Sequence, residues 1–120
     1  MVAADWYFDF VSPFAYLASE RLALLAPTIR VRYKPVLFAA LLDANGQKGP
    51  AEIPAKRAFT YRHVVRQAKQ LGIPLTFPHE HPFNPLPLLR LALAGDCAPY
   101  AVRRIFRFVW RDGRLPDLPI

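Results

Sequence analysis

Two short stretches near the start of the chain have the patterns of β-strands. Residues 6–11 are apolar apart from one Asp and rich in aromatic side chains, which is typical of a strand buried on both faces. Residues 29–34 alternate between apolar and cationic side chains, which is typical of a strand with one solvated face. A helical pattern separates them, so we expect two parallel strands in a right-handed β-α-β unit, with the first strand the more buried.

Helical patterns fill most of the remaining chain. The first should run from Pro13 to about Ala26, with Leu17, Leu24 and Leu25 on its buried side. Further helices are predicted over residues 37–44, 55–71, 86–94 and 99–112. Residues 73–87 hold five prolines but also large apolar side chains, which indicates an ordered connector. No segment after residue 36 has the period of two that a half-buried strand requires.

The two strands are too few for an independent sheet, because sheets usually hold about 5–6 strands. We therefore interpret residues 1–36 as the β-α-β part of an α/β domain and residues 37–120 as an inserted, all-helical domain. The other strands of the sheet should lie beyond Ile120. The sequence thus predicts the N-terminal portion of a larger α/β protein.

Ser12 and Pro13 stand between the first strand and the first helix. Serine is a favoured N-cap residue, and proline is favoured at the first helical position. The free N–H groups of a helix start stabilise an anion, and ligands of open α/β sheets bind at the carboxyl ends of the strands. Most serines of this kind are only caps, and no G-x-S-x-G surrounds Ser12 to indicate a hydrolase nucleophile. The local pattern leaves both readings open.

The charge of the chain changes this picture little. Sixteen Lys and Arg stand against nine Asp and Glu, a net charge of +7, and twelve of the cations are Arg. They are scattered along the sequence and do not form the runs that mark a polybasic tail. A small anionic ligand explains the excess as well as nucleic acid does, and we expect no nucleic-acid partner.

Cysteine and histidine also bound the chemistry. Cys97 is the single cysteine, so this stretch can form no internal disulfide or C-x-x-C redox pair. No stretch approaches the ~20 apolar residues of a membrane span, and we expect a cytoplasmic protein without membrane contacts. His79 and His81 flank Glu80, but no matching cluster accompanies them. We expect a loop with two exposed histidines and no metal.

Residues 8–18 (Phe-Asp-Phe-Val-Ser-Pro-Phe-Ala-Tyr-Leu-Ala) resemble the opening of 2-hydroxychromene-2-carboxylate isomerases and kappa-class glutathione transferases. The resemblance continues, in order, through residues 46–50, 54–57, 71–78, 83–86 and 89–90. It implies a thioredoxin-like fold of the DsbA type, with a helical domain inserted after the first β-α-β unit. The matching segments together span most of the 120 residues, and the implied insertion point agrees with the division at residue 36.

The resemblance also implies a mechanism. Ser12 takes the place that a cysteine holds in thioredoxin-like redox enzymes, and would hydrogen-bond the sulfur of bound glutathione, the cofactor. The thiolate would add to a small anionic or aromatic substrate, allow rotation about a former double bond, and leave again. A cytoplasmic homodimer would be the working form. Residues beyond Ile120 would complete the glutathione site, so this segment alone should be nearly inactive.

Several further positions are implied by the same resemblance. Pro13 and Phe14 would line the glutathione site beside Ser12. Gln47 matches a glutathione-binding Asn, and Lys56 matches a Lys that could meet a carboxylate. Leu42 aligns with a substrate-binding Lys of the naphthalene-pathway isomerases, while Glu52 and Ile53 align with their Asn-Arg pair. At these last three positions this chain departs from the substrate contacts of those isomerases. The resemblance therefore implies glutathione chemistry more strongly than it implies the chromene substrate.

Two alternatives remain beside the isomerase. A kappa-class-like glutathione transferase of different substrate range would keep Ser12 and change the substrate contacts. A non-redox binding protein of the DsbA family would keep the fold without the chemistry. The absence of a C-x-x-C pair argues against a thiol–disulfide oxidoreductase.

Overall fold

The computed structural model describes residues 2–25 and 28–116. The elements follow in the order β1 (Val2–Phe8), α1 (Pro13–Leu22), the 3₁₀ turn η1 (Ala23–Leu25), β2 (Ile29–Pro35), α2 (Phe38–Ala44), the 3₁₀ turn η2 (Pro50–Glu52), α3 (Pro54–Leu71), α4 (Leu86–Ala94) and α5 (Pro99–Trp110). Strands β1 and β2 form a two-stranded parallel sheet in which Val2 faces Ile29 and Phe8 faces Pro35. The predicted β-α-β unit is therefore confirmed.

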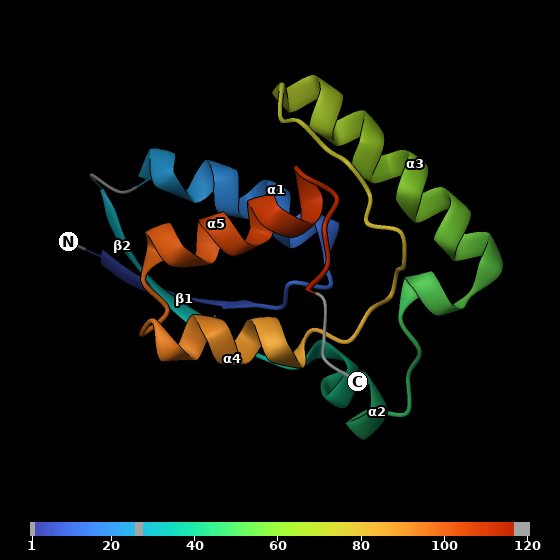
Figure 1. Cartoon of the computed structure of the whole chain (residues 1–120), viewed down its shortest axis with the longest axis horizontal. Helices are drawn as coiled ribbons and strands as arrows, with labels where there is room; N and C mark the ends of the chain where they lie inside the picture. The colour runs from blue at the N-terminus through green and yellow to red at the C-terminus, as the bar shows by residue number, and fades with distance from the viewer. Residues whose placement is uncertain (1, 26–27, 117–120) are drawn as a thin grey trace.

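The helices lie around this short sheet at different distances (Figure 1). Helices α1 and α5 lie side by side, and α4 contacts both α5 and β2. Helix α3 is set away from the sheet, beyond the end at which β1 leads into α1. In residues 37–116 the described chain contains helices, turns and loops but no strand, as the absence of a period-two pattern predicts. None of the described helices is both long and apolar enough to cross a bilayer.

The first strand begins and ends earlier than predicted, although residues 6–11 are more buried than residues 29–34, as predicted: Phe8, Asp9 and Phe10 are buried, and no residue of 29–34 is. The strand covers Val2–Phe8 and ends before Asp9, whose side chain accepts a hydrogen bond from the Val11 N–H and turns the chain. Its first four residues are exposed, with Val2 at 70%. Burial of both faces needs neighbouring layers, and in the described chain β2 is the only strand beside it. By contrast, β2 alternates between half-buried and exposed side chains as predicted.

The buried side of α1 also differs from the prediction. Leu17 is buried, but Leu24 and Leu25 are 76% and 42% exposed. The regular helix ends at Leu22, and the tighter 3₁₀ winding that follows turns these two side chains away from the face that carries Leu17. Tyr16 is fully buried in their place.

One core joins residues from both sides of residue 36. Phe8 and Phe10, around the end of β1, pack with Phe106 and Trp110 of α5, and the Phe10 and Phe106 ring centroids are 4.6 Å apart. Val102, Ile105, Phe106 and Val109 form the buried side of α5, as predicted. The division into domains 1–36 and 37–120 stays a prediction, and the described parts of both segments share this core.

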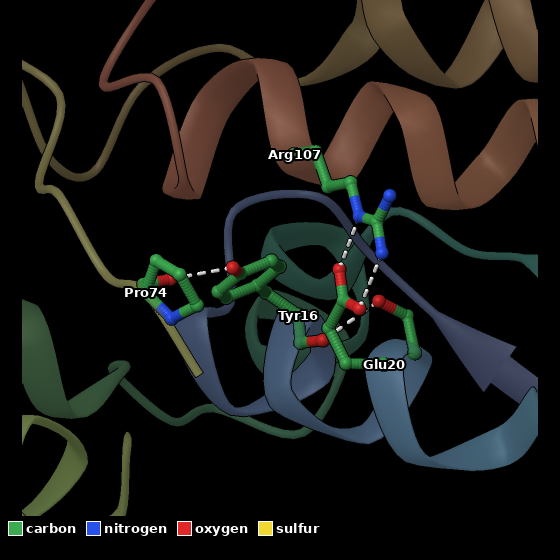
Figure 2. Close-up of polar contacts among 5 residues, drawn as sticks. Tyr16, Glu20, Pro74 and Arg107 are labelled. Atoms are coloured by element: carbon green, nitrogen blue, oxygen red, sulfur yellow. Dashed lines mark hydrogen bonds and ion pairs between the residues drawn. The ribbon is translucent and has the colours of Figure 1, made fainter. Parts of the chain in front are cut away.

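Polar contacts fix α1 against α5 and the proline-rich connector (Figure 2). The Arg107 guanidinium donates two hydrogen bonds to the Glu20 carboxylate, at 2.6 and 2.8 Å, and thereby lowers the pKa of Glu20. The Tyr16 hydroxyl donates to the Pro74 carbonyl at 2.5 Å. Burial raises the pKa of Tyr16 to about 12, so the hydroxyl stays protonated and keeps this bond. Helix α1 is thus held by α5 near its C-terminal end and by the connector in its first half.

Candidate functional site

A cavity of about 250 Å³ lies where β1 ends and α1 begins. Its wall is formed by side chains within residues 9–14, 38–42, 49–52 and 81–85, together with Thr60 of α3. Most of these side chains are apolar, and the charged residues among them are Asp9 and Glu52. The cavity thus lies at the carboxyl end of a parallel strand, where α/β proteins commonly bind ligands.

Ser12 is the N-cap of α1, as the sequence predicts. Its backbone is extended, with φ −98° and ψ 118°, and its Oγ accepts a hydrogen bond from the Ala15 N–H at 3.2 Å. The Ser12 O–H hydrogen is left free to donate, because the hydroxyl uses only an acceptor position in this bond. Ser12 lines the cavity and is half-buried. A hydroxyl donor at the positive end of a helix is a suitable partner for a sulfur anion.

The Asp9 carboxylate organises the turn that carries Ser12. It is 4% exposed, and it accepts hydrogen bonds from the Phe38 N–H at 2.8 Å and from the Val11 N–H at 3.2 Å. Burial raises the pKa of Asp9, while these N–H groups act in the opposite direction. Because Phe38 begins α2, the same carboxylate supplies an acceptor at the start of that helix. One side chain therefore positions both helix starts.

Two ring N–H groups bind successive carbonyls of this turn. Trp110 Nε1 donates to the Phe10 carbonyl at 2.8 Å, and His81 Nε2 lies 2.6 Å from the Val11 carbonyl. Because a carbonyl oxygen can only accept, the hydrogen of a neutral His81 ring lies on Nε2. Burial lowers the pKa of His81 below its ordinary value of 6.5. His81 Nδ1 is then an acceptor, and the Tyr61 hydroxyl donates to it at 2.6 Å.

The prediction of two exposed histidines was wrong for one of them. His79 is exposed, but His81 is half-buried and its ring packs on Trp110, with centroids 5.2 Å apart. The physical reason is that Phe83 and Trp110 draw the connector onto the core beside the turn. Among the residues that the structure describes, no group of three or more His, Cys, Asp or Glu could hold a metal ion.

The other predicted site residues divide into two groups. Ser12, Pro13, Phe14, Leu42 and Glu52 all line the cavity. The structure does not place Gln47, Ile53 or Lys56 in its wall. Gln47 and Lys56 are exposed, and Ile53 is the N-cap of α3. The roles of all these residues in binding stay predictions.

Asp9 and His81 are site residues that the sequence reasoning missed. A lone Asp in an apolar run just before a Ser-Pro helix start is a local signal that could have indicated a buried capping role for Asp9. His81 had no such signal, because its partner carbonyl is 70 residues away in the sequence.

These features define a class: a parallel β-α-β unit with a polar residue at the helix start and helices around it. Comparison with known proteins agrees, because residues 3–120 match the DsbA-like thioredoxin domain. The chain belongs to the family of DsbA-like thioredoxin domains. The predicted fold class is thereby confirmed.

The relatives of this chain within the family include named enzymes. It is 36% identical over 120 residues to a 2-hydroxychromene-2-carboxylate isomerase of Pseudomonas putida, covering 95% of this chain and 59% of the relative. It is 35% identical over 77 residues to glutathione S-transferase kappa 1 of Caenorhabditis elegans, covering 62% of this chain and 34% of that protein.

A solved structure of a 2-hydroxychromene-2-carboxylate isomerase matches with a TM-score of 0.80 at 30% identity, covering 98% of this chain and 60% of that one. The chain thus spans about three fifths of the length of the isomerases it matches.

We predict that Asp9→Asn destabilises the protein by ~1–3 kcal/mol, the cost of leaving a buried backbone N–H without its acceptor. Asparagine has one acceptor oxygen and one NH₂ group where Asp9 has two acceptor oxygens. Either the Phe38 N–H or the Val11 N–H would therefore face a donor in place of its acceptor. Urea denaturation at pH 7 measures the change, with Asp43→Asn on the exposed face of α2 as the matched control. Equal stability of the two variants would contradict the role given to Asp9.

Proposed function

We propose that the full-length protein is a glutathione-dependent isomerase in which Ser12 stabilises the thiolate of bound glutathione. The observation that carries the proposal is the position of Ser12: at the start of α1, on the wall of a cavity, with a hydroxyl hydrogen free to donate. The similarity to proteins named as isomerases and as a kappa-class transferase supports the choice of sulfur as the acceptor.

The proposed reaction regenerates glutathione. The thiolate adds to one carbon of a conjugated double bond, so that a C–S bond forms, the π electron pair moves into the conjugated acceptor group, and the former double bond becomes single. Rotation about the former double bond follows. The displaced pair then re-forms the double bond as the C–S bond breaks, and the thiolate leaves with the electron pair of that bond. The protein contributes position and electrostatics, because a hydroxyl donor and the positive end of α1 keep the sulfur charged.

The cavity accounts for an aromatic substrate. Phe14, Leu42 and Phe83 contribute apolar wall beside Ser12, and such surface binds the flat apolar part of an aromatic or conjugated carboxylate. Gln47 and Lys56 would bind polar ends of glutathione from outside this wall, as the resemblance implies. Residues after 120 would complete the glutathione site in a cytoplasmic homodimer, and residues 1–120 alone would be nearly inactive.

A second candidate function is favoured by the charges of the cavity wall. Among the described lining residues there is no Lys or Arg, while Asp9 and Glu52 are acidic. A substrate carboxylate would find no cation in this wall. That arrangement favours a kappa-class-like transferase, in which the thiolate adds to an uncharged apolar electrophile and the C–S bond is kept. Product analysis separates the two: an isomer with free glutathione, or a glutathione conjugate.

We predict that Ser12→Ala raises the thiol pKa of glutathione bound to the full-length protein by about one to two units, because a hydrogen bond to a charged sulfur contributes ~1.5–3 kcal/mol. The ultraviolet absorbance of the thiolate measures the pKa, and turnover should fall in parallel. Ser19→Ala is the matched control, since Ser19 lies buried in the same helix and bonds only the Tyr16 carbonyl. An unchanged thiol pKa in Ser12→Ala would leave Ser12 as a helix cap and nothing more.

We also predict that Glu52→Gln improves kcat/KM for a carboxylate substrate by up to about fivefold relative to its uncharged amide analogue. The factor is modest because Glu52 is exposed, and exposed charges interact by ~0–1 kcal/mol. Glu80→Gln, at an exposed residue outside the lining, is the control. The same ratio in both variants would show that Glu52 does not bias the cavity against anions.

A further inference from the structure

The peptide that joins Val11 to Ser12 has a side-chain partner of its own. Its carbonyl lies 2.6 Å from His81 Nε2, and it is the bond immediately before the N-cap residue. The orientation of this peptide sets the direction in which the Ser12 Cα, and hence Oγ, faces the cavity. The contact therefore reaches the candidate site through the backbone, although His81 and Ser12 are distant in sequence.

The imidazole is itself oriented by a second bond. The Tyr61 hydroxyl, from α3, lies 2.6 Å from Nδ1 at the other side of the ring. The ring also packs on Trp110, with centroids 5.2 Å apart and planes at 74°. A ring bonded at both nitrogens and packed against an indole presents its Nε2–H in one direction, which is what positioning a neighbouring peptide requires.

We propose that His81 is a positioning residue for Ser12, acting through its hydrogen bond to the Val11 carbonyl, and that its working form is the neutral imidazole, which accepts from Tyr61 at Nδ1. In imidazolium both nitrogens are donors, so the Tyr61 hydroxyl no longer donates to Nδ1. Protonation therefore leaves the Tyr61 hydroxyl only an acceptor role at Nδ1, while Nε2 still donates to the Val11 carbonyl, now as a charged donor. The effect on activity rests on the thiolate role proposed for Ser12; the effect on the peptide does not.

Few charged or titratable groups surround the imidazole. Tyr61 and Arg57 approach from α3, and burial, with a smaller contribution from the Arg57 charge, lowers the pKa of His81 below 6.5. Asp9, in the turn, and Glu52, the last residue of η2, line the same cavity as His81. Helix α5 places the uncharged indole of Trp110 against the ring. The ring should thus be neutral at pH 7 and should gain its proton only as the pH falls below 6.5.

The direct test follows the backbone nitrogen of Ser12 in full-length protein labelled with ¹⁵N-serine and ¹⁵N-histidine. Residues 1–120 contain two serines, so Ser19, buried within α1, serves as an internal reference. We expect the Ser12 amide ¹⁵N shift to titrate with the midpoint of the His81 ring, below 6.5, while Ser19 stays constant. A Ser12 signal that is constant while the His81 ring titrates would overturn the proposal.

Two substitutions separate positioning from simple packing. His81→Gln can place an amide N–H near the position of Nε2, whereas His81→Asn is too short to reach the Val11 carbonyl. We expect the Ser12 titration to disappear in His81→Gln, which would exclude Asp9 as its source. A titration that persists in His81→Gln would assign it to Asp9 and overturn the proposal. His79→Gln, at the exposed histidine of the same loop, should leave it unchanged.

The activity arm compares kcat and KM of the full-length protein in the same variants. We expect His81→Gln to stay within about twofold of the parent in kcat at pH 7, and His81→Asn to lose about tenfold in kcat with little change in KM, as for one lost hydrogen bond. Equal loss in both variants would show that bulk at this position matters and the donor does not. If glutathione does not bind at all, the proposed function fails, and the ¹⁵N titration still decides the role of His81.

Discussion

The four-residue turn between β1 and α1 depends on side chains that satisfy its backbone. Asp9 binds the Val11 N–H from within the turn, Trp110 binds the Phe10 carbonyl, and His81 binds the Val11 carbonyl. A buried carbonyl without a partner costs ~1–3 kcal/mol, so the turn could not take this path alone. The partners that fix its geometry come from α5 and the connector, and that geometry sets the position of Ser12.

The same bonds assemble the cavity from distant parts of the chain. Asp9 links the turn to the start of α2, and His81 links it to α3 through Tyr61. The apolar wall that results surrounds a hydroxyl at a helix start, which is an arrangement suited to a sulfur anion beside an aromatic group. The proposed chemistry thus needs no charged side chain in contact with the sulfur. It needs a fixed donor, and the turn provides one.

The sequence could predict the elements whose causes are local. The Ser12 cap, the proline start of α1, the alternation in β2 and the bounds of α4 all follow from neighbouring residues, and all are confirmed. The predicted burial of Leu24 and Leu25 and the predicted bounds of the first strand were wrong, because they depend on layers and winding that periodicity does not reveal.

The candidate site was likewise predictable only where its causes are local. The Ser-Pro step marked its centre, whereas the bonds that tie the turn to Phe38, His81 and Trp110 join residues 29 to 100 positions apart in the chain. His81 illustrates the difficulty, since its two nitrogens find partners on α3 and in the turn. Such contacts arise only after the connector has packed against α5.

The central claim is that the turn presents the Ser12 hydroxyl to the sulfur of glutathione. A crystal structure of the full-length protein with glutathione tests it most directly. The account predicts the sulfur within hydrogen-bond distance of Ser12 Oγ, at the mouth of the cavity and in front of the first N–H groups of α1. A sulfur bound elsewhere, with Ser12 Oγ bonded only to the Ala15 N–H, would contradict it.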